Sequence, residues 1–465
     1  MSILNHIGRA AGLLLHPTSL PSGKLDADAW RWLDLLAQAG VRVWQTLPLG
    51  IPLSGLSPYQ CASAFAVNPA LFPNSVLTQA KDDLFAGVEY QAWYQHQQHW
   101  LDDFALFMVL KQQYAGDWGQ WPEPIRQREP ATIQQLRKQY QAELQTIINQ
   151  QFAYYHYCKQ LRSYANERGI HLFGDMPIFV AYDSADVWAH PERFLLDDKG
   201  QPTYVTGVPP DYFSETGQRW GNPHYNWDYM QSEDFRWWKQ RLAYHFEFFD
   251  IVRIDHFRGF AASWMIPADQ DTALNGFWQT VPGDALLASI QAEMGTVPLV
   301  AEDLGCITPD VIALRDKYDI PGMSVLQFGF DHFEDNPHKP QNVRPNTVYY
   351  TGTHDNDTVV GWFSHLDSGM QQHVLDVLGC PTAEQVAPAM INTVLSSNAL
   401  LAMLPLQDLL GLGSEARMNV PGVAEGNWTW RFQWEQIPAN LASDLHNLLQ
   451  GHQRNERELE THTTS

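Results

Sequence analysis

Short apolar runs recur along the chain, and each ends at a polar residue or at Gly or Pro before a segment with helical spacing. Eight such runs lie at residues 12–17, 41–48, 171–180, 250–256, 298–305, 322–330, 347–355 and 400–408. Runs that are apolar on both faces and alternate with helical segments are typical of buried parallel strands. Eight of them predict a closed (β/α)8 TIM barrel. An open, doubly wound sheet is the alternative, but no Gly-x-Gly-x-x-Gly motif follows the first run.

The second and third runs are far apart in the sequence. Segments 93–114 and 133–168 between them show the i, i+3, i+4 apolar spacing of helices. We therefore predict a mainly helical insertion over residues 70–168, after the second strand of the barrel.

A second interruption follows the third run. Residues 181–226 are rich in Pro, Gly and aromatic residues, a composition that argues against disorder in so long a connection. We predict that they form a long aromatic lid loop at the barrel rim. The barrel and both insertions are predicted to form one catalytic domain over residues 1–450, followed by a polar tail at 451–465.

Composition narrows the range of partners. The chain has 29 basic and 52 acidic residues, a net charge of -23, which opposes binding to nucleic acid or to an anionic membrane. No stretch approaches the roughly 18 apolar residues that a membrane span needs. The four separated cysteines form no CxxC pair, which predicts a reduced, cytoplasmic protein without a zinc site. Many of the 18 Trp, 18 Tyr and 22 Phe residues lie beside Gly, Pro or Asp, which favours a carbohydrate ligand.

Polar residues are concentrated at the ends of the predicted strands. Catalytic residues of TIM barrels project from the C-terminal ends of the strands, so these positions are the candidates for chemistry. They are Asp175, Arg253, Asp255, His256, Glu302, Asp303, His354, Asp355, Asn356 and Asp408.

Two of these strand ends carry carboxylates suited to opposite tasks. Arg253 and Asp255 are two residues apart and share a face of their strand, so the cation stabilises the carboxylate as a nucleophilic anion. Glu302 follows an apolar run, and burial raises a carboxyl pKa towards that of a general acid. An ordinary buried ion pair and a helix-capping acid are the structural alternatives. For Asp303 and His256, on the other face of their strands, we expect structural roles.

These same segments resemble a known family. The sequences around Asp255, Glu302 and Asp355 are similar to the conserved regions of the α-amylase clan. Longer strings resemble, more specifically, the amylomaltases, which are 4-α-glucanotransferases also called disproportionating enzymes. They are Ser57-Pro-Tyr-Gln60 with Ser63-Ala-Phe-Ala66, Gly207-Val-Pro-Pro-Asp-Tyr-Phe213, Gly221-Asn-Pro223 and Glu415-Ala-Arg-Met-Asn419. The likeness extends from about residue 15 to residue 431, nearly the whole chain.

The resemblance implies a role for each site residue. Asp255 would be the nucleophile, Glu302 the acid/base, and Asp355 a third carboxylate that orients and distorts the donor sugar. The resemblance further implies substrate-binding or supporting positions at the same site for Arg253, His354, Asp175, Tyr59, Tyr212, Phe213 and Trp220. Tyr59 would form a stacking wall, and Tyr212, Phe213 and Trp220 would belong to a lid over the acceptor side.

The predicted function is transfer of α-1,4-glucan segments to the 4-hydroxyl of glucose or a maltooligosaccharide by a retaining double displacement. The partners implied are glucose, maltooligosaccharides and glucans derived from starch or glycogen, with no nucleic acid and no membrane. No cofactor and no metal are expected. An α-amylase-type hydrolase with the same three carboxylates is the nearest alternative, and a non-catalytic glucan-binding protein is the second. The oligomeric state does not follow from the sequence.

Overall fold

Eight parallel strands form one sheet in the computed structural model, which describes residue 4 and residues 7–53, 55–79, 82–210, 214–423 and 425–455. Their order is β10–β11–β12–β1–β2–β3–β6–β9. A backbone hydrogen bond from Ala301 N to Pro321 O, 2.8 Å long, joins the two outer strands and brings the sheet round on itself. Seven of the eight predicted runs contain one of these strands and the first run, 12–17, overlaps β1, so the predicted TIM barrel is confirmed. The strands are β1 (Ala10–Leu14), β2 (Val43–Gln45), β3 (His171–Pro177), β6 (Ile251–Asp255), β9 (Leu299–Ala301), β10 (Gly322–Val325), β11 (Thr347–Tyr350) and β12 (Leu401–Pro405).

Two hydrophobic layers hold the barrel together. Alternate residues of all eight strands form one cluster, to which Phe173, Ile251, Val300 and Leu401 belong, each 0% exposed. The intervening residues of the strands, such as Val252, belong to the larger cluster shared with the helices. Strands buried on both faces explain why the runs read as continuously apolar.

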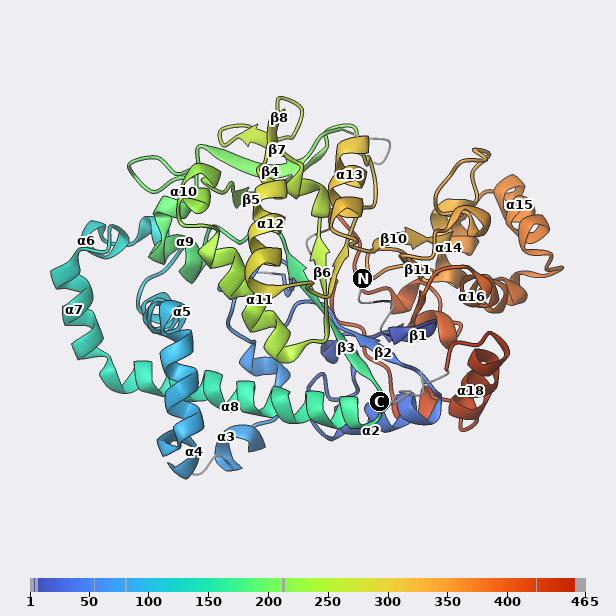
Figure 1. The fold of residues 1–465 in the computed structure, drawn as a ribbon, viewed down its shortest axis with the longest axis horizontal. Coiled ribbons are helices and arrows are strands. Elements are labelled where there is room, and N and C mark those ends of the chain that lie inside the picture. The colour runs from blue at the N-terminus through green and yellow to red at the C-terminus, as the bar shows by residue number, and fades with distance from the viewer. Residues whose placement is uncertain are drawn as a thin grey trace, which may run out of the picture.

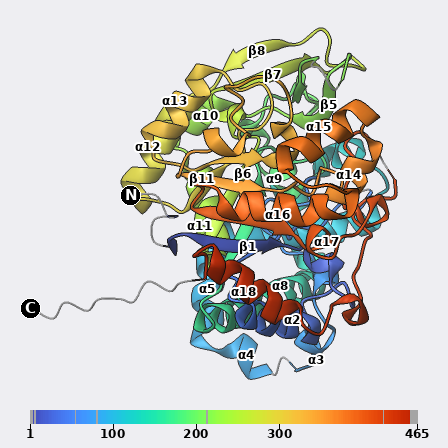
Figure 2. The same ribbon diagram turned by 90° about the vertical axis from the view of Figure 1, so that its right-hand side faces the viewer.

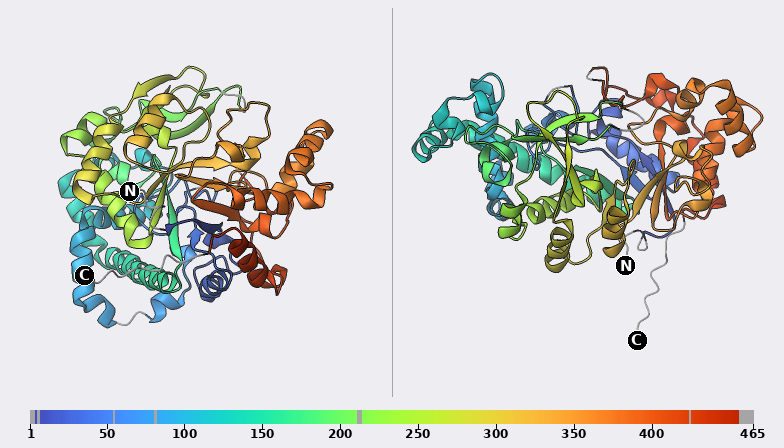
Figure 3. Two further views of the ribbon diagram at one scale, coloured as in Figure 1. Left: turned by 45° about the vertical axis from the view of Figure 1, so that its right-hand side comes forward. Right: turned by 90° about the horizontal axis from the view of Figure 1, so that it is seen from above.

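Helices surround the strands, as the views in Figures 1, 2 and 3 show. Those outside the two long insertions are α2 (Ala27–Gln38), α10 (Trp227–Ser232), α11 (Arg236–Phe248), α12 (Gly283–Met294), α13 (Pro309–Lys317), α14 (Val359–His365), α15 (Ser368–Leu378), α16 (Val386–Ser396), α17 (Leu406–Leu409) and α18 (Leu441–Gly451). Short 3-10 helices lie at Pro17–Ser19, Pro69–Leu71, Trp118–Gln120, Pro191–Arg193, Phe257–Phe260, Leu326–Gly329, Pro340–Asn342, Ala383–Gln385, Ser414–Ala416 and Trp434–Gln436.

The chain between β2 and β3 is helical and extends to one side of the barrel (Figure 1). Segment 93–114 was predicted as one helix and lies in α5, whereas segment 133–168 forms two helices that meet at Tyr140. The helices are α3 (Ser75–Gln79), α4 (Asp82–Ala86), α5 (Val88–Gln113), α6 (Glu123–Arg126), α7 (Pro130–Gln139) and α8 (Gln141–Glu167). Across the described part of the chain, no helix combines the length and the apolar character needed to cross a membrane.

A second sheet, antiparallel and in the order β5–β4–β7–β8, lies at the top of Figure 1. Residues 181–226, predicted as one lid loop, contain α9 and two of its strands in addition to loop. Gly207 is where β4 approaches β5 closely, because a Cβ there would lie 2.1 Å from Gln218 O. The elements are α9 (Ala185–Ala189), β4 (Tyr204–Val208), β5 (Gln218–Pro223), β7 (Ala262–Pro267) and β8 (Phe277–Thr280).

Arg454 fastens the end of the described chain to the first and last strands of the barrel. Its side chain is 0% exposed, and burial lowers its pKa to about 9. The guanidinium donates to the carbonyl of Ala10 at 2.9 Å and to that of Leu400 at 3.3 Å. Its remaining hydrogen bonds go to the carbonyls of Leu395, Ser397 and Ala399. Carbonyl oxygens thus solvate this buried cation.

We predict that Arg454→Met lowers the free energy of unfolding by about 3 kcal/mol, because buried carbonyls lose a charged donor. Thermal unfolding of the two proteins under identical conditions measures the difference. Arg344→Ala is the matched control, since that side chain is 59% exposed and forms a surface ion pair with Asp316. We expect the control to change stability by less than about 0.5 kcal/mol. Equal effects of the two substitutions would contradict a stabilising role for the Arg454 clamp, by which we mean the hydrogen bonds from its guanidinium to these carbonyls.

Candidate active site

The register of neighbouring strands determines which of the predicted site residues meet. Asp175 in β3 lies opposite Arg253 in β6. β6 pairs with β9 up to Ile254, and the hydrogen bond from Glu302 N to Ile254 O, 3.0 Å, continues this register by one residue. Asp255 and Glu302 therefore occupy adjacent strand ends.

Arg253 contacts two carboxylates at once. Its Nη1 donates to both oxygens of Asp175, at 2.8 and 2.7 Å, and its Nη2 lies 2.9 Å from Asp255 Oδ1. The side chains of Arg253 and Asp175 are 5% and 0% exposed, whereas that of Asp255 is 29% exposed. One buried cation thus compensates two anions, and of these Asp255 is the one that a ligand can reach.

The charge on Asp255 depends on opposing effects. Burial is the largest and raises the pKa of Asp255, and the neighbouring carboxylates of Asp175, Glu302 and Asp355 raise it as well, while Arg253 lowers it. Together these effects bring the pKa of Asp255 to about 8. The sequence predicts only the stabilisation by Arg253, because burial is a tertiary property. Burial also raises the pKa of Glu302. Interacting carboxyls titrate as a group, so this cluster retains a proton near neutral pH.

Backbone groups hold Glu302 in place. His256 N donates to Glu302 Oε2 at 2.7 Å, and Leu304 N donates to Glu302 Oε1 at 2.9 Å. His256 has φ of 52°, a left-handed conformation that is uncommon for a residue with a side chain. The turn directly after Asp255 therefore supplies a donor that fixes the carboxyl on the next strand.

Tyr59 links the two halves of the site. Its hydroxyl donates to Asp175 Oδ2 at 2.7 Å and lies 2.9 Å from His354 Nε2. The Tyr59 and His354 rings are stacked, with centroids 5.3 Å apart. His354 Nε2 in turn lies 3.4 Å from Asp355 Oδ1. Polar contacts thus run without a break from Asp355 to Asp255.

Asp355 follows β11 and is held by residues to which the sequence analysis assigns no role. Asn419 Nδ2 donates to Asp355 Oδ1 at 2.7 Å. Arg417 donates to the carbonyls of Asp355 and Asn419, at 2.6 and 2.7 Å. Both residues belong to the Glu415–Asn419 string quoted above, but neither lies near Asp355 in sequence, so only the fold reveals the contact. The Asp355 side chain is 47% exposed and available to a ligand.

Of the predicted lid residues, Trp220 is described. It lies in β5, and its ring meets that of His256 edge to face at 4.8 Å. Tyr212 and Phe213 lie outside the described residues. His256 thus contacts Glu302 through its backbone N–H and Trp220 through its ring.

Two further strand-end residues have structural partners. Asp303 forms an ion pair with the buried Arg315. Asp408 accepts hydrogen bonds from Thr351 Oγ1 at 2.6 Å and from Val359 N at 2.8 Å. Among the residues that the structure describes, no three His, Cys, Asp or Glu side chains are grouped as a metal site would require.

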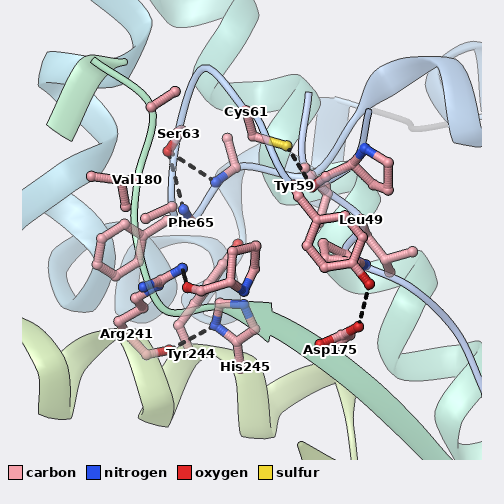
Figure 4. A pocket seen from close by; sticks show the side chains of 18 of the residues that line it. Leu49, Tyr59, Cys61, Ser63, Phe65, Asp175, Val180, Arg241, Tyr244 and His245 are labelled. Carbon is pink, nitrogen blue, oxygen red and sulfur yellow. Dashed lines mark hydrogen bonds between the residues drawn. The ribbon is translucent and has the colours of Figure 1, made fainter. Parts of the chain in front are cut away.

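A cavity of about 50 Å³ lies behind the site. Figure 4 shows Tyr59 and Asp175 on one side of it and Arg241 and Tyr244 on the other. Asp255, Glu302 and Asp355 do not line this cavity, so it is separate from the carboxylate cluster.

Comparisons with known proteins agree with these features. A family model described as 4-alpha-glucanotransferase matches residues 14–88 and 74–437. The chain is 44% identical to the 4-alpha-glucanotransferase of Thermus thermophilus and 43% identical to that of Synechocystis, in each case over 94% of this chain and 96% of the relative. The solved amylomaltase of Streptococcus agalactiae in complex with acarbose is 33% identical, with a TM-score of 0.91 over 96% of this chain and 99% of that one.

The contact between Asn419 and Asp355 generates a prediction. Asn419→Ala removes the 2.7 Å hydrogen bond, so the carboxylate loses its fixed orientation. Misplacement of such a group costs up to about 10²-fold in turnover, which steady-state assays on maltotriose measure. Asn440→Ala is the control, because Asn440 also donates to an aspartate, Asp444, but on an exposed helix. A fully active Asn419→Ala variant would show that Arg417 and His354 suffice to hold Asp355.

Proposed function

The chain belongs to the 4-alpha-glucanotransferase family and is an enzyme of that activity, and for its mechanism we propose a retaining double displacement with Asp255 as nucleophile and Glu302 as acid/base. The observation that carries the proposal is the placement of Asp255 and Glu302 on adjacent strand ends, with Arg253 in contact with Asp255 alone of the pair. The substrates are α-1,4-glucans and maltooligosaccharides, with glucose or another glucan as acceptor.

The distribution of charge supports these roles. Asp255 forms an ion pair with Arg253, whereas no basic side chain in the described part of the chain forms one with Glu302. Of the two carboxyls that share a proton, the one beside the cation is favoured as the anion. We therefore assign the negative charge to Asp255 and the proton to Glu302, in a cluster where burial raises the pKa of both carboxyls.

In the first step, Glu302 transfers its proton to the glycosidic oxygen as Asp255 attacks the anomeric carbon. The bond between that carbon and the leaving oxygen breaks, and a β-glucosyl ester of Asp255 forms. In the second step, Glu302 removes the proton from the 4-hydroxyl of the acceptor, whose oxygen attacks the anomeric carbon and releases Asp255. Two inversions give an α-1,4 bond again.

Asp355 and His354 act on the donor sugar in this proposal. Asp355 is partly exposed and fixed by Asn419, so it can accept hydrogen bonds from the 2- and 3-hydroxyls as the ring flattens. Tyr59 offers a ring face beside them, and its hydroxyl contacts both His354 and Asp175 and so fixes their relative positions.

The lid is proposed to exclude water from the glucosyl-enzyme. The contact of Trp220 with the ring of His256, whose backbone N–H donates to Glu302, supports this proposal. Tyr212 and Phe213 are proposed to extend this surface. A bound acceptor glucan would rest against these rings and occupy the space that a hydrolytic water needs. We also propose that the enzyme works in the cytoplasm, in line with the four separated cysteines.

Incubation with maltotriose tests the proposed function. We expect free glucose together with a ladder of longer maltooligosaccharides, because the enzyme passes each cut segment to another chain. Product sizing by chromatography gives the result, and Asp255→Asn protein provides the blank. Products confined to glucose and maltose would instead identify a hydrolase.

A pair of substitutions tests the two carboxylates. With α-glucosyl fluoride, whose leaving group needs no proton, Glu302→Gln is expected to release fluoride once and to stop as a glucosyl-enzyme detectable by intact mass. Asp255→Asn is expected to release none and to lose about 10⁴-fold or more in turnover, because the amide cannot form the ester. If Glu302→Gln is equally slow in its first step with the fluoride and with maltotriose, Glu302 is not the acid.

A further inference from the structure

His16 ends the first strand run and is buried, with 5% of its surface exposed, but the mechanism above does not use it. Its Nδ1 accepts a hydrogen bond from Leu47 N at 3.2 Å. A ring nitrogen that accepts carries no proton, so the proton of the neutral His16 is on Nε2. Burial and the neighbouring His354 lower the pKa of His16 to about 3, which keeps the ring neutral.

The tautomer of His354 follows from its contact with Tyr59. The hydroxyl of Tyr59 has one hydrogen, and it donates this hydrogen to the Asp175 carboxylate. Its oxygen therefore accepts from His354 Nε2, 2.9 Å away, and Asp355 Oδ1 also faces this nitrogen at 3.4 Å. His354 must carry its proton on Nε2. Burial lowers its pKa, so the ring is neutral and Nδ1 has a free lone pair.

A cavity of about 20 Å³ is lined by both rings, together with Thr353, Asn356 and Arg417. Within the described ranges, neither His16 Nε2 nor His354 Nδ1 has a protein hydrogen-bond partner. A water molecule needs about 10–15 Å³ of such space and two or more polar partners. The volume is sufficient for one water, and His16 and His354 are both among the residues that line the cavity.

We propose that a buried water in this cavity accepts a hydrogen bond from His16 Nε2–H and donates one to His354 Nδ1, which makes His16 a positioning residue for His354. The water and Tyr59 then act on the two ring nitrogens of His354 and hold its neutral Nε2–H tautomer. In the other tautomer, two lone pairs would face each other at Tyr59, and Nε2 would present no donor to Asp355 or to a sugar hydroxyl. The effect on turnover rests on the proposed function, whereas the tautomer itself does not.

Two substitutions separate the nitrogens of His16. The amide oxygen of His16→Asn lies near the position of Nδ1 and can still accept from Leu47 N, but nothing donates into the cavity. His16→Gln places an amide donor near the position of Nε2 and loses the acceptor for Leu47 N. We expect His16→Asn to lower kcat on maltotriose by at least about tenfold with little change in KM. His16→Gln should recover several-fold of that loss. The reverse order would mean that His16 only supports the backbone at Leu47 and would overturn the proposal.

Nuclear magnetic resonance tests the tautomer directly, in the intact protein and without substrate. Long-range ¹H–¹⁵N correlation spectra at neutral pH distinguish protonated from bare ring nitrogens among the 18 histidines, and the signal lost in His354→Gln gives the assignment. We expect His354 to show a protonated Nε2 and a bare Nδ1. A proton on Nδ1, or on both nitrogens, would overturn the proposal even if glucan transfer proceeds as described. The expected tautomer in a protein that transfers no glucan would overturn the proposed function and leave the hydrogen-bond network standing.

Discussion

The site depends on one guanidinium that serves two carboxylates. Arg253 is buried inside the barrel, and its partner Asp175 is buried completely, so we regard this ion pair as a fixed part of the fold. In the proposed mechanism, the second contact of Arg253, to Asp255, is the one that changes, because ester formation would remove the negative charge of that carboxylate. When this happens, the cation still has Asp175, and no buried charge is left without a partner. In the proposed mechanism, Asp175 therefore keeps Arg253 paired while Asp255 reacts.

Tyr59 lies in a loop far from the other site residues in sequence, yet it contacts two of them. Its hydroxyl contacts both Asp175 and His354, so the strand ends of β3 and β11 are connected across the barrel mouth. The resemblance implies only a stacking wall for Tyr59. The structure adds a polar connection between Asp175, the partner of Arg253, and His354, the neighbour of Asp355.

Local pattern was enough for part of this result. Buried parallel strands are apolar on both faces, so all eight could be located in the sequence. The polar residues at the ends of these strands then gave Asp255, Glu302 and Asp355 as candidates. Contacts between distant segments could not be found in this way, as for Asn419 with Asp355 or Leu47 with His16. The pairing of β4 with β7, which follows Asp255 in the sequence, could not be found for the same reason. The pKa of Asp255 likewise depends on burial, which strand pattern alone does not give.

The clamp at Arg454 has a consequence for synthesis on the ribosome. β1 is made first, yet its neighbour β12 and the side chain that ties both together are made last. Throughout translation, the early strands present an open, apolar sheet edge of the kind that pairs with other chains. The ring of strands can therefore close only after β12 has been synthesised, and until then the edge of β1 stays without its neighbour.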